Sequence, residues 1–198
     1  MIARQLELNL QLYTYKDYLA WGEDVKCELI DGVVYNMASP TTAHQDLVSR
    51  LWSIFRDFLK GRRCKAYFAP LDVRLNAHSY DDIVVQPDVI ILCDRSKLDP
   101  AGRGIIGAPD MIIEVLSPTT AYTDRVLKHQ KYMLAGVKEY WIVDIENKLL
   151  EVYLLEGGKY FSQKHGKNGK VPVQTFPGLE IDLAEIFAED TWDTEIDT

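Results

Sequence analysis

Two carboxylates set among apolar residues, Asp88 and Glu114, are the side chains of this chain best suited to bind a metal ion. Asp88 stands in the segment 86–91 (QPDVII) and Glu114 in the segment 110–117 (DMIIEVLS). Runs of β-branched and aliphatic residues of this kind are typical of strands buried on both faces. A charge in such a strand is costly unless it is paired or binds a metal. Two such strands side by side would offer a divalent cation the oxygen ligands it needs.

The segments around these carboxylates predict the elements that position them. Strands are expected at 64–75, 83–93 and 110–116, with a Gly/Pro-rich loop at 99–104. A helix should then end near Gly136, because a left-handed glycine is a common helix stop. The remaining elements predicted by periodicity and turn residues are helices at 14–22 and 41–59, a hairpin at 25–37 around Asp31-Gly32, and a strand meander at 139–144, 149–154 and 159–163. This mixture favours an α+β or mixed α/β fold with a mixed central sheet.

The start of the helix after Glu114 decides whether Lys128 can reach the carboxylates. Ser117-Pro118 is a plausible pair for the N-cap and the first helical position, and Thr123 is a second candidate for the cap. A start at Pro118 would put Lys128 about 15 Å along the helix axis, too far for an easy return to the strand end. Because the threonines in between are indifferent helix formers, we favour the start near Thr123, which leaves Lys128 within reach.

Length and composition indicate a globular protein. The 198 residues, 47% of them hydrophobic, suffice for a substantial core, and no apolar run approaches the ~18–20 residues of a membrane span. The first residues lack the apolar core of a signal peptide. Cys27, Cys64 and Cys93 are widely scattered, and we interpret them as buried thiols in a reducing cytoplasm rather than as a disulfide framework or a zinc site. We therefore expect a cytoplasmic protein with one domain over residues 1–190.

The charge is unevenly distributed. The net charge is −8, but residues 180–198 carry eight acidic residues and no Lys or Arg, so the body of the chain is neutral. The whole-chain charge is consequently a poor guide to any local binding surface. We interpret residues 191–198 as an acidic, frayed tail.

An ordered series of motifs resembles the Uma2-type restriction endonucleases, a branch of the PD-(D/E)XK nuclease superfamily. The resemblance runs from about Thr14 to Leu183. The motifs that carry it are 27–32 (CELIDG), Ser39-Pro40 followed by His44, 86–88 (QPD), 109–110 (PD), 114–118 (EVLSP), then Asp124, Lys128 and Tyr132, and 136–144 (GVKEYWIVD).

The resemblance implies a restriction-endonuclease-like core and a set of site residues. Asp88 and Glu114 match the acidic positions of the superfamily motif, and Glu28 matches an acidic residue that helps to hold metal. The motif's lysine would stand two residues after the second acid, where this chain has Leu116, and the resemblance implies that Lys128 takes its role. The backbone carbonyl of Val115 is expected as a further ligand of Mg²⁺ or Mn²⁺.

Each of these assignments competes with a simpler structural reading. Asp88 and Glu114 could be neutralised by basic side chains, Glu28 could be solvated beside its turn, and Lys128 could serve as the i,i+4 partner of Asp124. The other residues weighed are Lys131 as a rival lysine, His44 as a capping or packing residue in preference to a catalyst, Tyr140 and Trp141 as core, and Lys60, Arg62, Arg63 and Lys65 as either phosphate contacts or a solvated helix end.

The function that these inferences favour is metal-dependent hydrolysis of DNA phosphodiester bonds. By analogy with nucleases of this fold, which often pair subunits to cut two strands, we expect a homodimer and no membrane partner. Two alternatives stay open: a catalytically inactive binding or assembly module with the same fold, and an enzyme acting with the same carboxylates on RNA or another phosphodiester.

Overall fold

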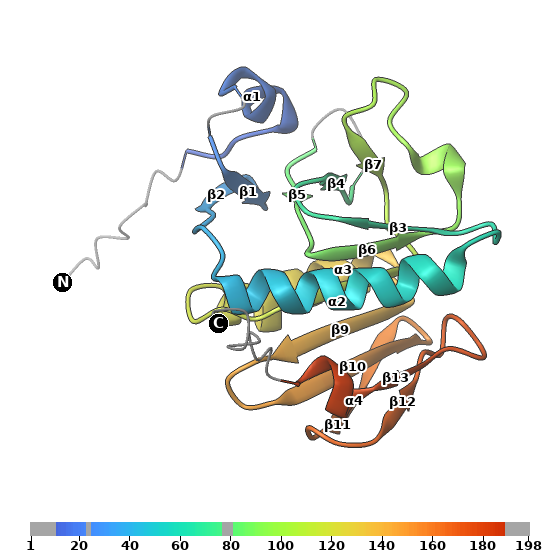
Figure 1. Cartoon of the computed structure of the whole chain (residues 1–198). Coiled ribbons are helices and arrows are strands. Elements are labelled where there is room, and N and C mark those ends of the chain that lie inside the picture. Colours follow the sequence, from blue (N-terminus) through green and yellow to red (C-terminus); the bar gives the residue numbers. More distant parts are fainter. Residues whose placement is uncertain (1–10, 23–24, 77–80, 189–198) are drawn as a thin grey trace, which may run out of the picture.

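The computed structural model describes residues 11–22, 25–76 and 81–188 (Figure 1). The strands in these residues are β1 (Cys27–Ile30), β2 (Val33–Asn36), β3 (Lys65–Phe68), β4 (Asp72–Arg74), β5 (Val84–Val85), β6 (Val89–Leu92), β7 (Gly104–Ile106), β8 (Met111–Val115), β9 (Glu139–Asp144), β10 (Leu149–Glu156), β11 (Lys159–His165), β12 (Lys170–Pro172) and β13 (Glu180–Asp182). The helical segments are α1 (Tyr15–Ala20), α2 (Thr42–Leu59), the 3-10 turn η1 (Arg95–Lys97), the π-helix η2 (Thr123–Lys128), α3 (His129–Ala135) and α4 (Leu183–Ile186).

The strands pair into mixed sheets. The larger sheet has the order β11-β10-β9-β8-β6-β3, and the smaller sheet has the order β2-β1-β5-β4-β7. In Figure 1 the smaller sheet lies above the larger one, and α2 runs across the front of the larger sheet. This arrangement confirms the predicted α+β class with a mixed central sheet flanked by helices.

The centre of the larger sheet positions the carboxylates. Strands β8 and β9 pair in parallel and are buried along their whole length, as their continuous apolar runs predict. Alternate side chains of these strands face opposite ways: Ile113 and Val115 join the core under α2, whereas Ile112 joins the core that contains Tyr132 of α3. Glu114 shares the face of Ile112 and therefore points toward η2 and α3.

Two predicted strands are each split at a proline. The expected strand 64–75 becomes β3 and β4, and the expected strand 83–93 becomes β5 and β6; in each case the halves lie in different sheets. Pro70 and Pro87 lie at the breaks, where a residue without an N–H cannot continue a ladder. Because both crossings run from one sheet to the other, Gln86-Pro87-Asp88 lies at the junction of the sheets.

The loop expected at 99–104 ends in a strand. Gly104 begins β7, which pairs in parallel with β4. Its φ of 146° and a position where a Cβ would overlap the carbonyl oxygen of Asp72 both require glycine. The Gly/Pro-rich segment predicted a loop, which forms up to residue 103, but not the strand that begins at Gly104.

The interpretation of all three cysteines as free thiols is wrong. Cys64 and Cys93 form a disulfide with a Cα–Cα distance of 3.9 Å, and Cys27 is a buried free cysteine. Strands β3 and β6 pair antiparallel with Lys65 opposite Leu92, so the two flanking cysteines stand opposite each other. A separation of 29 residues hides this register from the sequence.

The other element predictions are confirmed, with one shift. Thr14 caps α1 through its N–H bond to Asp17 (2.8 Å), Gly136 ends α3 with φ 92°, and the hairpin, α2 and the β9–β11 meander form as expected. The expected tail at 191–198 lies outside the described residues. Among the residues described, no helix is long and apolar enough to cross a membrane.

The helix begins close to the favoured start near Thr123. Residues 118–120 form a turn, in which Ser117 Oγ accepts the N–H of Thr120 at 3.3 Å. Residues 121 and 122 are helical, Tyr122 with angles of −70° and −45°, and the π-helix η2 begins at Thr123. Lys128 reaches Glu114 because the helix packs back over the face of β8 that carries Glu114.

Candidate metal and catalytic site

Asp88 and Glu114 lie side by side across the β6–β8 pair. Strand β6 pairs with β8 so that Val89 stands opposite Ile113, which places Asp88, just before β6, opposite Glu114. Val115 N–H donates to Asp88 Oδ2 at 2.7 Å, and Asp88 N–H points to Glu114 Oε2 at 3.4 Å. The Asp88 side chain is 17% exposed, and that of Glu114 is 4% exposed. Asp88 is thus the carboxylate that meets solvent.

Glu28 reaches the same place from the smaller sheet. It lies on β1 and is buried, so its interpretation as a solvated turn residue is wrong. Glu28 Oε1 accepts the backbone N–H of Gln86 at 2.8 Å and lies 2.8 Å from Lys128 Nζ. Glu28 therefore joins the two sheets at the segment that carries Asp88.

Lys128 Nζ stands at the centre of three carboxylates. It lies 2.8 Å from Glu28 Oε1, 3.0 Å from Glu114 Oε1 and 3.2 Å from Asp124 Oδ1. The i,i+4 contact with Asp124 is therefore present together with the contact to Glu114, so the two readings of Lys128 do not exclude each other. The π-helix η2 carries both Asp124 and Lys128, and π-helical turns are frequent at functional sites.

The rival lysine points elsewhere. Lys131 Nζ lies 2.6 Å from Asp31 Oδ1, and the side chain of Asp31 is 59% exposed. Asp31 belongs to the turn between β1 and β2. This ion pair holds Lys131, whose side chain is 14% exposed, against the turn and not at the carboxylate cluster.

The cluster carries an excess of negative charge. Burial raises the pKa of Glu114 well above its usual value, and Asp124, Asp88 and Glu28 raise it further against the opposing effect of Lys128. Burial opposes the charge of Lys128, but Glu114, Glu28 and Asp124 together hold the pKa of Lys128 well above its usual range. Lys128 is therefore a cation that three carboxylates, Glu28, Glu114 and Asp124, share.

Tyr132 is a site residue to which sequence reasoning assigned no role. Its hydroxyl donates to Glu114 Oε1 at 2.7 Å, and the side chain is fully buried. Burial, then the neighbouring Glu114, raises the pKa of Tyr132 well above its usual value, so Tyr132 stays a donor. With Lys128 on the same oxygen, Glu114 Oε2 is left to face Asp88. The spacing 128, 132 on one helix face could have indicated this pair.

His44 also lies in the site rather than acting as a cap. Thr41 caps α2 by accepting the His44 N–H at 3.2 Å, while the ring packs against β8. His44 Nε2 lies 3.0 Å from the Val115 carbonyl oxygen and 3.3 Å from Asp88 Oδ2. Burial alone would lower the pKa of His44, but the hydrogen bond and charge of Asp88 raise it overall.

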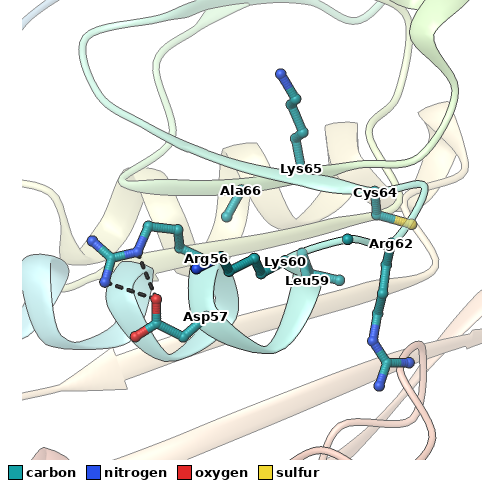
Figure 2. A pocket seen from close by; sticks show the side chains of 9 residues that line it. Arg56, Asp57, Leu59, Lys60, Arg62, Cys64, Lys65 and Ala66 are labelled. Carbon is teal, nitrogen blue, oxygen red and sulfur yellow. Dashed lines mark hydrogen bonds and ion pairs between the residues drawn. The ribbon is translucent and has the colours of Figure 1, made fainter.

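The basic cluster lies away from this site. Figure 2 shows an open pocket at the C-terminal end of α2, where Arg56 pairs with Asp57 and the side chains of Lys65 and Arg62 extend in opposite directions. The Arg62 guanidinium stacks over the Phe58 ring, 4.1 Å from its centre. Since α2 rises about 1.5 Å per residue, this end lies about 22 Å along the helix from His44. The pocket does not open into the carboxylate cluster.

The donor set fits a hard divalent cation. Carboxylates of Asp88 and Glu114 and the carbonyl of Val115 are oxygen ligands at one edge of β8, and Mg²⁺ typically takes one or two carboxylates with water and substrate oxygens. Among the described residues, no group of three or more His, Cys, Asp or Glu side chains is placed to hold a metal ion without movement, which argues against a preformed structural zinc centre. A cation at Asp88 and Glu114 would offset the negative charge that Lys128 leaves uncompensated.

The chain is similar to two known proteins. A curated protein from Synechocystis sp. (strain ATCC 27184 / PCC 6803 / Kazusa), "Uncharacterized protein slr1290", is 29% identical over 158 residues, which are 78% of this chain and 74% of that protein. The crystal structure of "a putative nuclease belonging to DUF820" from Anabaena variabilis ATCC 29413 matches with a TM-score of 0.72 at 22% identity, over 88% of this chain and 97% of that one. At this identity the structural match shows the fold.

A family model covers most of the chain. Residues 15–184 match the Uma2 model, which is described as "Putative restriction endonuclease". The match spans β1, β6, β8 and η2, and so includes every residue of the carboxylate cluster. The chain therefore belongs to the Uma2 family.

Proposed function

We propose that this protein is a divalent-metal-dependent nuclease that hydrolyses DNA phosphodiester bonds. The observation that carries the proposal is the pairing of β6 with β8, which sets Asp88 beside Glu114 and next to the Val115 carbonyl. Membership in a nuclease family supports a nucleic acid as the substrate. Cutting both strands of a duplex would use two such sites, so we expect two copies of the chain to act together.

The chain's own residues have distinct tasks in this reaction. A bound Mg²⁺ or Mn²⁺ would supply an activated water and stabilise charge on the phosphoryl oxygens. Asp88 and Glu114, with the Val115 carbonyl, would hold the ion, and Asp88 would do so at the solvent-facing side. Glu28 would assist by holding Lys128, since its Oε1 lies 2.8 Å from Lys128 Nζ.

Lys128 would act as a fixed positive charge. Because its pKa is raised well above the usual range by the surrounding carboxylates, it cannot accept a proton from the attacking water near neutral pH. It can instead orient Glu114 and stabilise negative charge that develops on the phosphate. Lys128 would thus serve by electrostatic stabilisation and not by proton transfer.

The deciding experiment is a cleavage panel with matched variants. The purified chain would be incubated with plasmid DNA, linear duplex DNA and RNA, each with Mg²⁺, Mn²⁺ or a chelator. We expect metal-dependent DNA cleavage that Asp88→Ala and Glu114→Gln abolish. Asp46→Ala is the control, because Asp46 is an exposed acid on α2.

The outcomes separate the alternatives. Cleavage of RNA in preference to DNA would assign the same site to another substrate. Mn²⁺ binding without cleavage of any substrate would favour an inactive binding or assembly module. If Asp88→Ala cleaves as well as the parent, the activity belongs to other residues or to a contaminant, and the proposal fails.

A further inference from the structure

His44 holds a position that neither helix capping nor core packing explains. Thr41 supplies the cap of α2, so the ring is free to serve another purpose. The ring instead turns its Nε2 toward Val115 O at 3.0 Å and Asp88 Oδ2 at 3.3 Å. These are the two oxygen-bearing groups that, with Glu114, form the proposed metal site.

We propose that His44 Nε2 is a nitrogen ligand of the divalent cation, beside Asp88, Glu114 and the Val115 carbonyl. This inference rests on the proposed function, because it assigns a further ligand to the same site. Adjacent ligands of an octahedral ion with bonds of about 2.1 Å stand about 3.0 Å apart. The distances of 3.0 Å and 3.3 Å from His44 Nε2 match that spacing. An ion could therefore bind with small side-chain shifts and no rearrangement of α2.

The remainder of the ring argues against a purely structural role. His44 Nδ1 is buried and has no hydrogen-bond partner among the described residues. A buried polar atom without a partner costs free energy, so His44 is a poor choice for a packing position. Nδ1 stays without a partner when an ion binds Nε2, so the free energy of that coordination would have to exceed the cost.

Charge also favours an imidazole at this position. Glu28, Asp88, Glu114 and Asp124 already give the cluster more negative charge than Lys128 balances. A neutral imidazole adds a strong ligand without a further negative charge. Because imidazole ligands suit first-row transition metals while Mg²⁺ takes oxygen ligands, the site should bind Mn²⁺ in preference to Mg²⁺.

The test is spectroscopic and does not depend on catalysis. Mn²⁺ would be titrated into the purified full chain, and pulsed electron paramagnetic resonance would detect coupling of the ion to a ¹⁴N nucleus. The variants are His44→Gln, which keeps an amide donor near Val115 O but lacks the imidazole nitrogen, and His165→Gln on β11 as a control. Circular dichroism and thermal unfolding would confirm that each variant is folded.

Each outcome decides the inference. We expect ¹⁴N coupling in the parent and in His165→Gln and its loss in His44→Gln. The Mn²⁺ affinity of His44→Gln should fall by at least the roughly tenfold to hundredfold that loss of an outer-shell contact costs. Mn²⁺ binding that depends on Asp88 but shows no ¹⁴N coupling would overturn the role of His44 and leave the proposed function standing. No Mn²⁺ binding by the folded parent would overturn both.

Discussion

Lys128 places its Nζ 3.0 Å from Glu114 Oε1, although the two residues lie on different elements. The expected lysine position, just after β8, is Leu116, which is buried in the core that contains Ile112 and Tyr132. The positive charge comes instead from the helix that packs over that face. Strand β8 thus supplies the carboxylate of Glu114 together with core contacts, and η2 supplies the positive charge of Lys128.

Removal of the charge at Lys128 should destabilise the fold. Lys128→Met leaves Glu28, Glu114 and Asp124 buried without their shared cation, and loss of one partner of a buried ion pair costs about 3–5 kcal/mol. Urea unfolding at neutral pH would measure the loss. Lys131→Met is the matched control and should cost less than about 1 kcal/mol, because its partner Asp31 is largely exposed.

A double variant separates charge from packing. If the cost in Lys128→Met comes from uncompensated carboxylates, adding Glu114→Gln should recover part of the lost stability, since it removes one of the buried charges. Equal costs for the single and double variants would mean that Lys128 acts through packing of its aliphatic stem.

Tyr132 should affect both the metal affinity of the site, through Glu114, and the stability of the fold. Tyr132→Phe removes the hydrogen bond to Glu114 Oε1 (2.7 Å) and should cost about 1–2 kcal/mol. Tyr160→Phe is a fair comparison, because it loses a similar bond to the Val137 carbonyl (2.9 Å) away from the site. We expect similar losses of stability from both variants but weaker Mn²⁺ binding, by calorimetry, in Tyr132→Phe. Equal metal affinities would show that Tyr132 is purely structural.

The disulfide can be checked by counting thiols. Denatured, unreduced protein should react with a thiol reagent at one cysteine per chain, Cys27, because Cys64 and Cys93 are bonded to each other. After reduction, three thiols per chain should react. Three reactive thiols before reduction would show that the pair is open in the purified protein.

Local patterns predicted the elements that bear the site well. Strands buried on both faces are apolar throughout, so the carboxylates of Asp88 and Glu114 were conspicuous against that background. The helices at 14–22 and 41–59, the turn Asp31-Gly32 and the stop at Gly136 depend on a few neighbouring residues, and these elements formed as expected.

Features that depend on distant pairing could not be predicted in this way. Glu28 enters the cluster because the smaller sheet meets the larger one at Gln86, which is a matter of tertiary packing. The role of His44 depends on which face of β8 lies under α2. The Cys64–Cys93 bond follows from the register of β3 and β6. Each of these contacts joins residues at least 29 positions apart, so patterns among neighbouring residues do not predict them.

A second ion-pair cluster should make stability depend on pH. Arg125 contacts Asp144 Oδ2 at 2.8 Å and Glu151 Oε1 at 2.9 Å. Burial alone would raise the pKa of both carboxyl groups, but hydrogen bonds, including those from Arg125, lower the pKa of Asp144 and of Glu151. A carboxyl group whose pKa is lower in the folded protein than in the unfolded protein stabilises the fold at pH values above its unfolded pKa. This stabilisation is lost as the pH falls through its folded pKa.

Arg125→Met should therefore be less stable than the parent at neutral pH, by roughly 1–3 kcal/mol before solvent screening. Because the Arg125 side chain is 35% exposed, screening by solvent reduces this loss. The difference from the parent should shrink below about pH 4, where carboxyl groups ordinarily take up protons. Urea unfolding over a pH series would measure both limits. Arg56→Met, whose partner Asp57 is exposed, should show a small difference that hardly changes with pH. A difference for Arg125→Met that stays constant into acid would mean that its packing, and not its charge, stabilises the fold.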